Sequence, residues 1–241
     1  MRLLMAVRGP RPAESPSQFP YGTIWRVKQL NTRPLASFLG AAMATTWAWI
    51  AVTAAIPSAA AEPCSDVEVI FARGTGEGPG VGGNGQVFVD TLRTQAGGKS
   101  VSVYAVNYPA SQDFANSIAA GAGDASAHVQ STVANCPNTR MVLGGYSQGA
   151  AVVDSITETM PPEVADHVAA VAVLGNPKST YAAKLFGGPL PAISPLYAPK
   201  TIDLCVQDEP FCSEGGNWLA HDFYGFTGLT VKAAAFAAGR L

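Results

Sequence analysis

Short apolar segments alternate with segments of helical pattern from Glu62 to the C-terminus. Runs of about four to eight apolar or β-branched residues are typical of strands that are buried on both faces. We expect five such strands, at 67–72, 100–106, 141–145, 168–174 and 201–206. We expect helices at 84–96, 111–133, 148–159 and 222–239. Strands that alternate with helices predict a three-layer α/β/α sandwich around a central, mostly parallel five-stranded sheet.

A serine stands at the turn between the third expected strand and the helix that follows it. The segment reads Gly145-Tyr146-Ser147-Gln148-Gly149, with glycines two residues to either side of the serine. Such glycines let strand and helix pack closely around a strained serine backbone, which is the nucleophile elbow of an α/β-hydrolase. The pentapeptide alone is a weak signal, and its position between a strand and a helix strengthens it. Ser147 is therefore the candidate nucleophile.

A serine nucleophile needs a base to remove its proton and an acid to orient that base. In α/β-hydrolases the chain order is serine, acid, histidine. The sequence has three histidines. His128 precedes the serine, and His167 precedes the fourth strand, which places it at the wrong end of the sheet. His221 follows the fifth strand and its loop, so chain order and position select His221 as the base.

Two adjacent carboxylates lie where the acid is expected, just beyond the fifth strand. Asp208 and Glu209 both stand in the loop between Cys205 and Cys212. A disulfide across this loop would clamp it, which suits a residue that holds an imidazole in one tautomer. Local reasoning leaves open which of the two carboxylates is the acid.

An oxyanion hole needs donors directed at the charge that develops on the substrate oxygen. One donor is expected at the backbone N–H that follows the nucleophile, which is Gln148. The second is expected after an early strand, where Thr75 lies among glycines in the segment Phe71-Ala72-Arg73-Gly74-Thr75-Gly76-Glu77. The same glycine-rich segment lacks the G-K-[ST] of a phosphate-binding loop.

The N-terminal residues 1–61 differ in charge and composition from residues 62–241. They hold six basic side chains and one acidic side chain, and no charge occurs between Arg33 and Glu62. A basic start, the apolar segment 35–56 and the small residues at 57–61 predict a secretory signal. The competing interpretation is an uncleaved anchor, because the apolar segment is close to the roughly 20 residues that span a bilayer. We therefore expect an exported hydrolase domain at 62–241, secreted or held at the cell envelope.

Cysteine content and charge restrict the classes of partner. Four cysteines in an exported domain predict two disulfides, and spacing favours Cys64–Cys136 and Cys205–Cys212 among the three possible pairings. The absence of a C-x-x-C motif argues against a zinc site. Residues 62–241 hold nine basic and sixteen acidic side chains, without a basic cluster, which argues against nucleic-acid binding.

These motifs occur together in one known family. The matching residues are Ala72-Arg73-Gly74-Thr75-Gly76-Glu77, Gly145-Tyr146-Ser147-Gln148-Gly149-Ala150, Cys205-x6-Cys212, His221 and the partners Cys64 and Cys136. With them, residues 62–241 resemble the cutinases and cutinase-like serine esterases, including the actinobacterial secreted group and the related acetylxylan esterases. The resemblance implies a compact, lid-less α/β-hydrolase with an exposed serine, no metal and no cofactor. It also implies oxyanion donors at Gln148 and at Thr75, where the family commonly has serine.

The loop between the last two cysteines departs from the family pattern. That pattern is Cys-x-x-Gly-Asp-x-x-Cys, in which the aspartate is the acid. Here Glu209 stands at the position of the aspartate and Asp208 at the position of the glycine. Glutamate serves as the acid in some α/β-hydrolases. We therefore favour Glu209, whose additional methylene must be accommodated by the loop, and keep Asp208 as the alternative acid.

The leading functional prediction is a secreted, monomeric serine esterase that acts on short-to-medium acyl esters or lipids. The alternatives are a polysaccharide acetyl esterase and a catalytically weak surface protein with the same fold, which only the Glu209 departure favours. Side chains that could form an apolar rim for the acyl chain, or simply pack in the core, are Ile193, Leu196, Tyr197, Phe211, Leu219 and Phe223.

Overall fold

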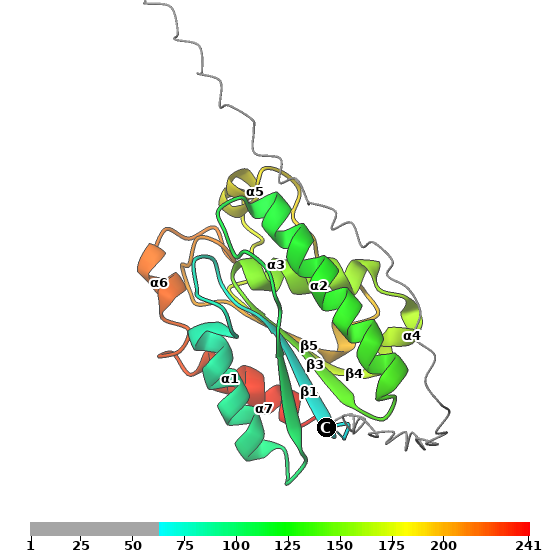
Figure 1. The fold of residues 1–241 in the computed structure, drawn as a ribbon. Helices are drawn as coiled ribbons and strands as arrows, with labels where there is room; N and C mark the ends of the chain where they lie inside the picture. Colours follow the sequence, from blue (N-terminus) through cyan, green and yellow to red (C-terminus); the bar gives the residue numbers. More distant parts are fainter. Residues whose placement is uncertain (1–62) are drawn as a thin grey trace, which may run out of the picture. The chain divides into compact units, whose positions relative to one another are not determined.

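The computed structural model describes residues 63–241, and the predicted signal or anchor in residues 1–61 lies outside the described residues. Five strands form one parallel sheet in the order β2-β1-β3-β4-β5 (Figure 1). They are β1 (Val67–Ala72), β2 (Val101–Ala105), β3 (Arg140–Tyr146), β4 (Val168–Leu174) and β5 (Thr201–Leu204). The predicted five-stranded sheet is confirmed, and every pairing within it is parallel.

Helices cover both faces of the sheet, as Figure 1 shows. The helices are α1 (Gly82–Gln95), α2 (Phe114–Asn135), α3 (Gln148–Thr159), α4 (Pro162–Ala165), α5 (Thr180–Phe186), α6 (Trp218–Asp222) and α7 (Leu229–Ala238), with a 3₁₀ turn at Ala198–Lys200. α1 and α7 pack together on one face, and α2 and α3 pack together on the other. The three-layer α/β/α sandwich expected from the sequence is therefore confirmed. No helix within residues 63–241 combines the length and the hydrophobicity that a membrane crossing requires.

Alternate residues of the central strands point to opposite layers. In β1, Val69 and Phe71 join the core under α1 and α7, whereas Ile70 joins the core under α2 and α3. All three are fully or almost fully buried. A strand that is buried on both faces has no solvent-exposed face that would favour polar side chains. This explains why these strands are continuous apolar runs in the sequence.

Two predicted helices differ from those in the structure. The closing helix expected at 222–239 is divided into α6 and α7, because the connecting segment contains Gly225 and Gly228, and Gly228 adopts a left-handed φ of 76°. The helix expected at 111–133 is α2, which begins and ends two to three residues later and runs unbroken through Gly121 and Gly123. A Cβ at Gly121 would lie 2.9 Å from a methyl carbon of Val152, so this glycine lets α2 approach α3.

The register of the sheet brings several loops to one edge. Ala72 pairs with Gly145, Tyr146 with Leu174, and Leu174 with Leu204. The carboxyl ends of β1, β3, β4 and β5 are therefore level with one another. In an open parallel sheet this edge is where ligand-binding residues gather.

The first disulfide lies at the opposite end of the sheet from these loops. Cys64 precedes β1 and Cys136 follows α2, and the structure joins them. It also joins Cys205 to Cys212. This is the pairing that the cysteine spacing favoured.

Candidate active site

The backbone around Ser147 is tightly turned. Ser147 lies between β3 and α3 with φ 56° and ψ −121°, a left-handed φ that non-glycine residues rarely adopt. A Cβ at Gly145 would overlap the carbonyl of Gly149, and a Cβ at Gly149 would overlap the carbonyl of Ala72. Both glycines are thus required for strand, turn and helix to pack, and the contact with Ala72 brings the loop after β1 against the serine.

Three side chains predicted from the sequence form a continuous hydrogen-bonded chain. Ser147 Oγ lies 2.8 Å from His221 Nε2, and His221 Nδ1 lies 2.7 Å from Glu209 Oε1. Ser147 is 7% exposed, His221 9% and Glu209 fully buried. Ser147 and His221 are therefore the members of this chain that a substrate can reach, whereas Glu209 is closed off from solvent.

The imidazole of His221 is held by its neighbours. Its ring lies 4.3 Å from that of Phe211 and 5.2 Å from that of Tyr146, between centroids. The Tyr146 hydroxyl donates to the carbonyl oxygen of His221 at 2.5 Å. Burial raises the pKa of Tyr146, so this hydroxyl keeps its proton and remains a donor. Ring and backbone of His221 are thereby fixed together.

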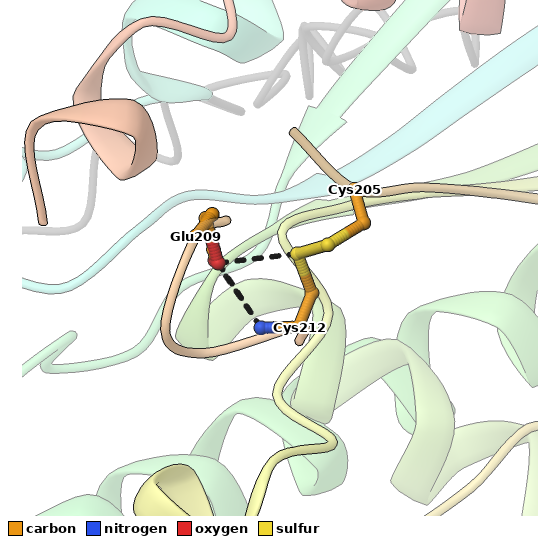
Figure 2. Close-up of side chains that lie close together, drawn as sticks. All are labelled: Cys205, Glu209 and Cys212. Carbon is orange, nitrogen blue, oxygen red and sulfur yellow. Dashed lines mark hydrogen bonds between the residues drawn. A yellow bond between two sulfur atoms is a disulfide. The ribbon is translucent and has the colours of Figure 1, made fainter. Parts of the chain in front are cut away.

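Glu209 folds back onto its own loop (Figure 2). Its Oε2 accepts the backbone N–H groups of Phe211 and Cys212, each at 3.0 Å, while Oε1 faces His221. Oε2 also lies 3.1 Å from the Cys212 sulfur, which is bonded to the sulfur of Cys205 and carries no proton to donate. The additional methylene of glutamate is thus accommodated by a side chain that curls over the clamped loop.

Asp208 takes a different conformation from its neighbour. It has a left-handed φ of 61°, its side chain is exposed, and its carbonyl oxygen accepts the N–H of Asn217 at 2.8 Å. A glycine at this position of the family pattern fits the left-handed backbone. Of the two candidate acids, Glu209 is the one that contacts His221.

Thr75 lies in the wall of a cavity, and the backbone amides of the residues on either side of it are hydrogen-bonded. The N–H of Gly74 donates to the Glu77 carboxylate at 2.6 Å, and the N–H of Gly76 donates to the carbonyl of Ala110 at 2.8 Å. Because both flanking amides are occupied, the loop holds Thr75 in one position beside the serine.

Gln148 is immobilised through its side chain. Its Oε1 accepts the Ser117 hydroxyl at 3.1 Å, its Nε2 donates to the carbonyl of Ser111 at 2.8 Å, and the residue is fully buried. Its backbone N–H belongs to the first turn of α3, where amides have no acceptor within the helix. Gln148 itself is fully buried and does not contribute to the wall of the cavity that Ser147 lines.

A cavity of about 860 Å³ opens over Ser147 and His221. The residues around them in its wall are Thr75, Glu77, Gly83, Asn84, Val87, Gln112, Phe114, Tyr146, Leu185, Phe186, Phe211, Asp222, Gly225 and Phe226. Its volume lies within the range of about 300–1,000 Å³ that is typical of small-molecule sites.

The sequence left open whether six apolar side chains form a rim for the acyl chain or pack in the core. Of these six, only Phe211 lines the cavity. Tyr197 is fully buried in the core under α2 and α3, and Ile193 packs against that core. The actual apolar wall uses Phe114, which opens α2, and Leu185 and Phe186 at the end of α5, a helix that the sequence analysis missed.

Signals for α5 are nevertheless present in the sequence. The hydroxyl of Ser179 accepts the N–H of Ala182 at 2.9 Å as an N-cap, and Gly187 ends the helix with a left-handed φ of 83°. A serine before and a glycine after a seven-residue segment are the usual boundary signals of a helix. No comparable signal predicts Phe226, which reaches the cavity from the glycine-containing turn after α6.

The remaining histidines lie away from the serine. His128 in α2 has its Nε2 3.0 Å from a carboxylate oxygen of Glu68 in β1. His167 directly precedes β4, at the amino end of the sheet. Within residues 63–241, the one group of three potential metal ligands is Cys205, Glu209 and Cys212. Its two sulfurs are bonded to each other, so they offer no thiolate to a metal.

A second buried polar cluster lies beneath α3. Asp154 accepts a hydrogen bond from Asn176 Nδ2 at 3.3 Å, and the same nitrogen donates to Asp203 at 3.2 Å. Asp203 also pairs with the Lys178 ammonium. Burial raises the pKa of Asp154 to about 7, with the charge of Asp203 adding to this, while the Asn176 hydrogen bond and Lys178 oppose it.

Comparison with known proteins places this geometry in a family. The family model described as Cutinase matches residues 63–241. The chain is 54% identical over 213 residues to carboxylesterase Culp1 of Mycobacterium tuberculosis H37Rv, covering 88% of this chain and 98% of that protein. It is 44% identical to phospholipase Culp4 of the same organism, covering 94% and 99%.

A solved structure agrees with these sequence relatives. The Trichoderma reesei cutinase, in complex with a phosphonate inhibitor, matches with a TM-score of 0.56 and 33% identity. The match covers 73% of this chain and 75% of that one. The resemblance inferred from the sequence motifs is confirmed, and the chain belongs to the cutinase family.

Proposed function

We propose that the protein is a secreted serine esterase that hydrolyses short-to-medium acyl esters or lipids through Ser147, His221 and Glu209. The observation that carries this proposal is the chain from Ser147 Oγ through both imidazole nitrogens to Glu209, at 2.8 and 2.7 Å. Distances of this length allow a proton to pass between serine and imidazole. The names of the relatives, a carboxylesterase and a phospholipase, support hydrolysis of ester bonds.

The reaction follows from the position of each atom. Ser147 Oγ attacks the ester carbonyl carbon while its proton passes to His221 Nε2. Glu209 Oε1 accepts a hydrogen bond from Nδ1–H, which keeps its proton, and the carboxylate stabilises the imidazolium that forms. Nε2 then gives its proton to the leaving alcohol, and an acyl-serine remains. Water, deprotonated by the same nitrogen, releases the acid and restores the serine.

The tetrahedral intermediates carry a negative oxygen that needs hydrogen-bond donors. The anchored loop of Thr75 and the backbone N–H of Gln148 are the proposed donors, because both lie beside Ser147 in fixed positions. Removal of one oxyanion donor typically costs about 3–4 kcal/mol of transition-state stabilisation. The N-terminus of α3 adds a positive dipole end at the same place.

The cavity supports a substrate with an acyl chain. Phe114 and Phe186 stack with ring centroids 4.3 Å apart, and Leu185 and Phe211 extend this apolar wall. An acetyl group would leave most of such a wall uncovered by substrate, so longer acyl chains are favoured over acetyl groups. The alternative of a catalytically weak surface protein was favoured only by the departure at Glu209. Because Glu209 contacts His221 directly, this departure gives no reason to prefer that alternative.

Export is supported by two features. The N-terminal segment has the composition of a secretory signal. Both disulfides of the domain require an oxidising compartment to persist.

The proposal is tested by hydrolysis of p-nitrophenyl esters from acetate to dodecanoate by the purified protein. We expect turnover with a maximum at an intermediate chain length. Ser147→Ala should lower kcat by on the order of 10⁶-fold, with an unchanged circular dichroism spectrum. Retention of more than a few per cent of the wild-type rate by this variant, with contamination excluded, would disprove the assignment of the nucleophile.

A further inference from the structure

The cavity over Ser147 has two chemically different sides. The apolar side comes from the start of α2, from α5 and from the disulfide loop, through Phe114, Phe186 and Phe211. The other side comes from the loop after β1, from α1 and from α6 with the turn that follows it. It carries polar groups, among them Asn84, beside the apolar side chains of Val87 and Phe226. In Figure 1, α5 lies beside the start of α2, whereas α6 lies near α1. An ester bound between them would place its acyl chain on the first side and its alcohol on the second.

The polar side is acidic. It contributes the carboxylates of Glu77 and Asp222 to the cavity wall. Within residues 63–241, neither lysine nor arginine lines this cavity. Glu77 cannot swing away, because its carboxylate accepts the N–H groups of Gly74 at 2.6 Å and Gly83 at 2.7 Å. Asp222 is exposed at the mouth and directly follows His221.

Two segments that line the cavity also carry a basic side chain, and neither side chain belongs to the lining. Arg73 is 5% exposed, and its guanidinium donates to the backbone carbonyls of Glu77, Val106 and Tyr108. Lys184 lies on α5 but outside the cavity lining. A phosphate in the alcohol position would therefore meet two carboxylates and no cation.

We propose that Glu77 and Asp222 make this enzyme select esters of uncharged polyols, such as acylglycerols, over the same esters bearing a phosphate. This inference rests on the proposed esterase function. Carboxylates and the Asn84 amide hydrogen-bond hydroxyl groups well, whereas like charges at about 6 Å disfavour binding by roughly threefold to tenfold per pair. The family itself leaves the choice open, since its members include a named carboxylesterase and a named phospholipase.

The test uses two substrates that differ only in a terminal phosphate group, 1-decanoylglycerol and 1-decanoylglycerol 3-phosphate, both below their micellar concentrations. The measured quantity is the ratio of their kcat/KM values, which cancels any general effect of a substitution on catalysis. We expect the wild type to prefer the uncharged ester by at least about tenfold. Asp222→Asn should lower this preference for the uncharged ester about threefold, and Asp222→Lys should lower it about tenfold or more. Added NaCl should also lower the preference of the wild type for the uncharged ester, because salt screens the carboxylates.

Glu163→Gln is the matched control. It removes one acidic charge from α4, at the amino end of β4 and away from the cavity, and should leave the ratio unchanged. Thermal unfolding midpoints check that each variant is folded. A wild-type ratio near one, or a ratio that Asp222→Asn does not change, would overturn the inference.

Hydrolysis of p-nitrophenyl hexanoate by the same wild-type preparation separates the two possible failures. If the wild type does not hydrolyse p-nitrophenyl hexanoate, the proposed esterase function itself is refuted. If it occurs while the two glycerol esters react equally, or while neither reacts, only the selection by charge is refuted.

Discussion

Replacement of Glu209 by glutamine tests the most specific feature of the proposed site. Glu209 Oε2 accepts two backbone N–H groups, and Oε1 faces His221 Nδ1 at 2.7 Å. In Glu209→Gln, an amide nitrogen placed on the loop side would face the N–H groups of Phe211 and Cys212, donor against donor. Leaving such buried donors unsatisfied costs on the order of 1–3 kcal/mol each, so the amide oxygen should take that side.

The amide nitrogen of the introduced glutamine would then point at the imidazole and impose the wrong tautomer. Nδ1 would have to accept, which leaves the proton on Nε2 and directs an N–H at Ser147 Oγ. An imidazole in that state cannot take the serine proton. We expect kcat to fall on the order of 10⁴-fold, which is the cost of the equivalent change in a serine protease.

Initial rates with p-nitrophenyl hexanoate measure this loss, and thermal unfolding verifies the fold. Asp208→Asn is the matched control, because it makes the same chemical change one residue earlier on an exposed side chain. It should alter kcat by less than about twofold. A Glu209→Gln enzyme that keeps more than a tenth of wild-type kcat, or a crippled Asp208→Asn enzyme, would refute the reasoning.

Three further predictions concern stability. Because the pKa of Asp154 is raised to about 7, the folded protein binds this proton more tightly than the unfolded chain, so stability falls as pH rises from about 4 to 7. Asp154→Asn should therefore raise the melting temperature at pH 8 and leave it nearly unchanged at pH 4, as differential scanning fluorimetry would reveal; equal shifts at both pH values would contradict this. Asp208→Gly should stabilise the protein by about 0.5–1 kcal/mol in urea titrations, since glycine adopts the left-handed backbone without strain, and a loss of stability would argue against that cause. Replacing both cysteines of Cys64–Cys136 by alanine should cost roughly 4 kcal/mol of stability in the same titrations. The same replacement at Cys205–Cys212 should cost roughly 2.5 kcal/mol, because this disulfide closes a shorter loop, and it should also lower kcat by freeing Glu209. A larger loss of stability at Cys205–Cys212 than at Cys64–Cys136 would refute the loop-closure argument.

Much of this architecture could be predicted from local patterns in the sequence. The strands of the sheet are apolar runs because both of their faces are buried, so burial and sequence pattern coincide. The elbow around Ser147 is equally local, because its glycines are required by contacts within a strand–turn–helix unit. Chain order then sufficed to select His221 from three histidines.

Other features depend on backbone conformation and on contacts between segments that are distant in the sequence. The division of the closing helix and the cavity wall were missed, because Phe114, Leu185 and Phe226 meet only when α2, α5 and the turn after α6 converge. The choice between Asp208 and Glu209 depends on a single backbone dihedral and two loop amides, which turn one carboxylate to solvent and the other to His221. The type and order of residues thus determined which candidate nucleophile, base and acids this chain has. The packing of the loops in the tertiary structure sets the directions of these side chains, and so decided which of them are in contact.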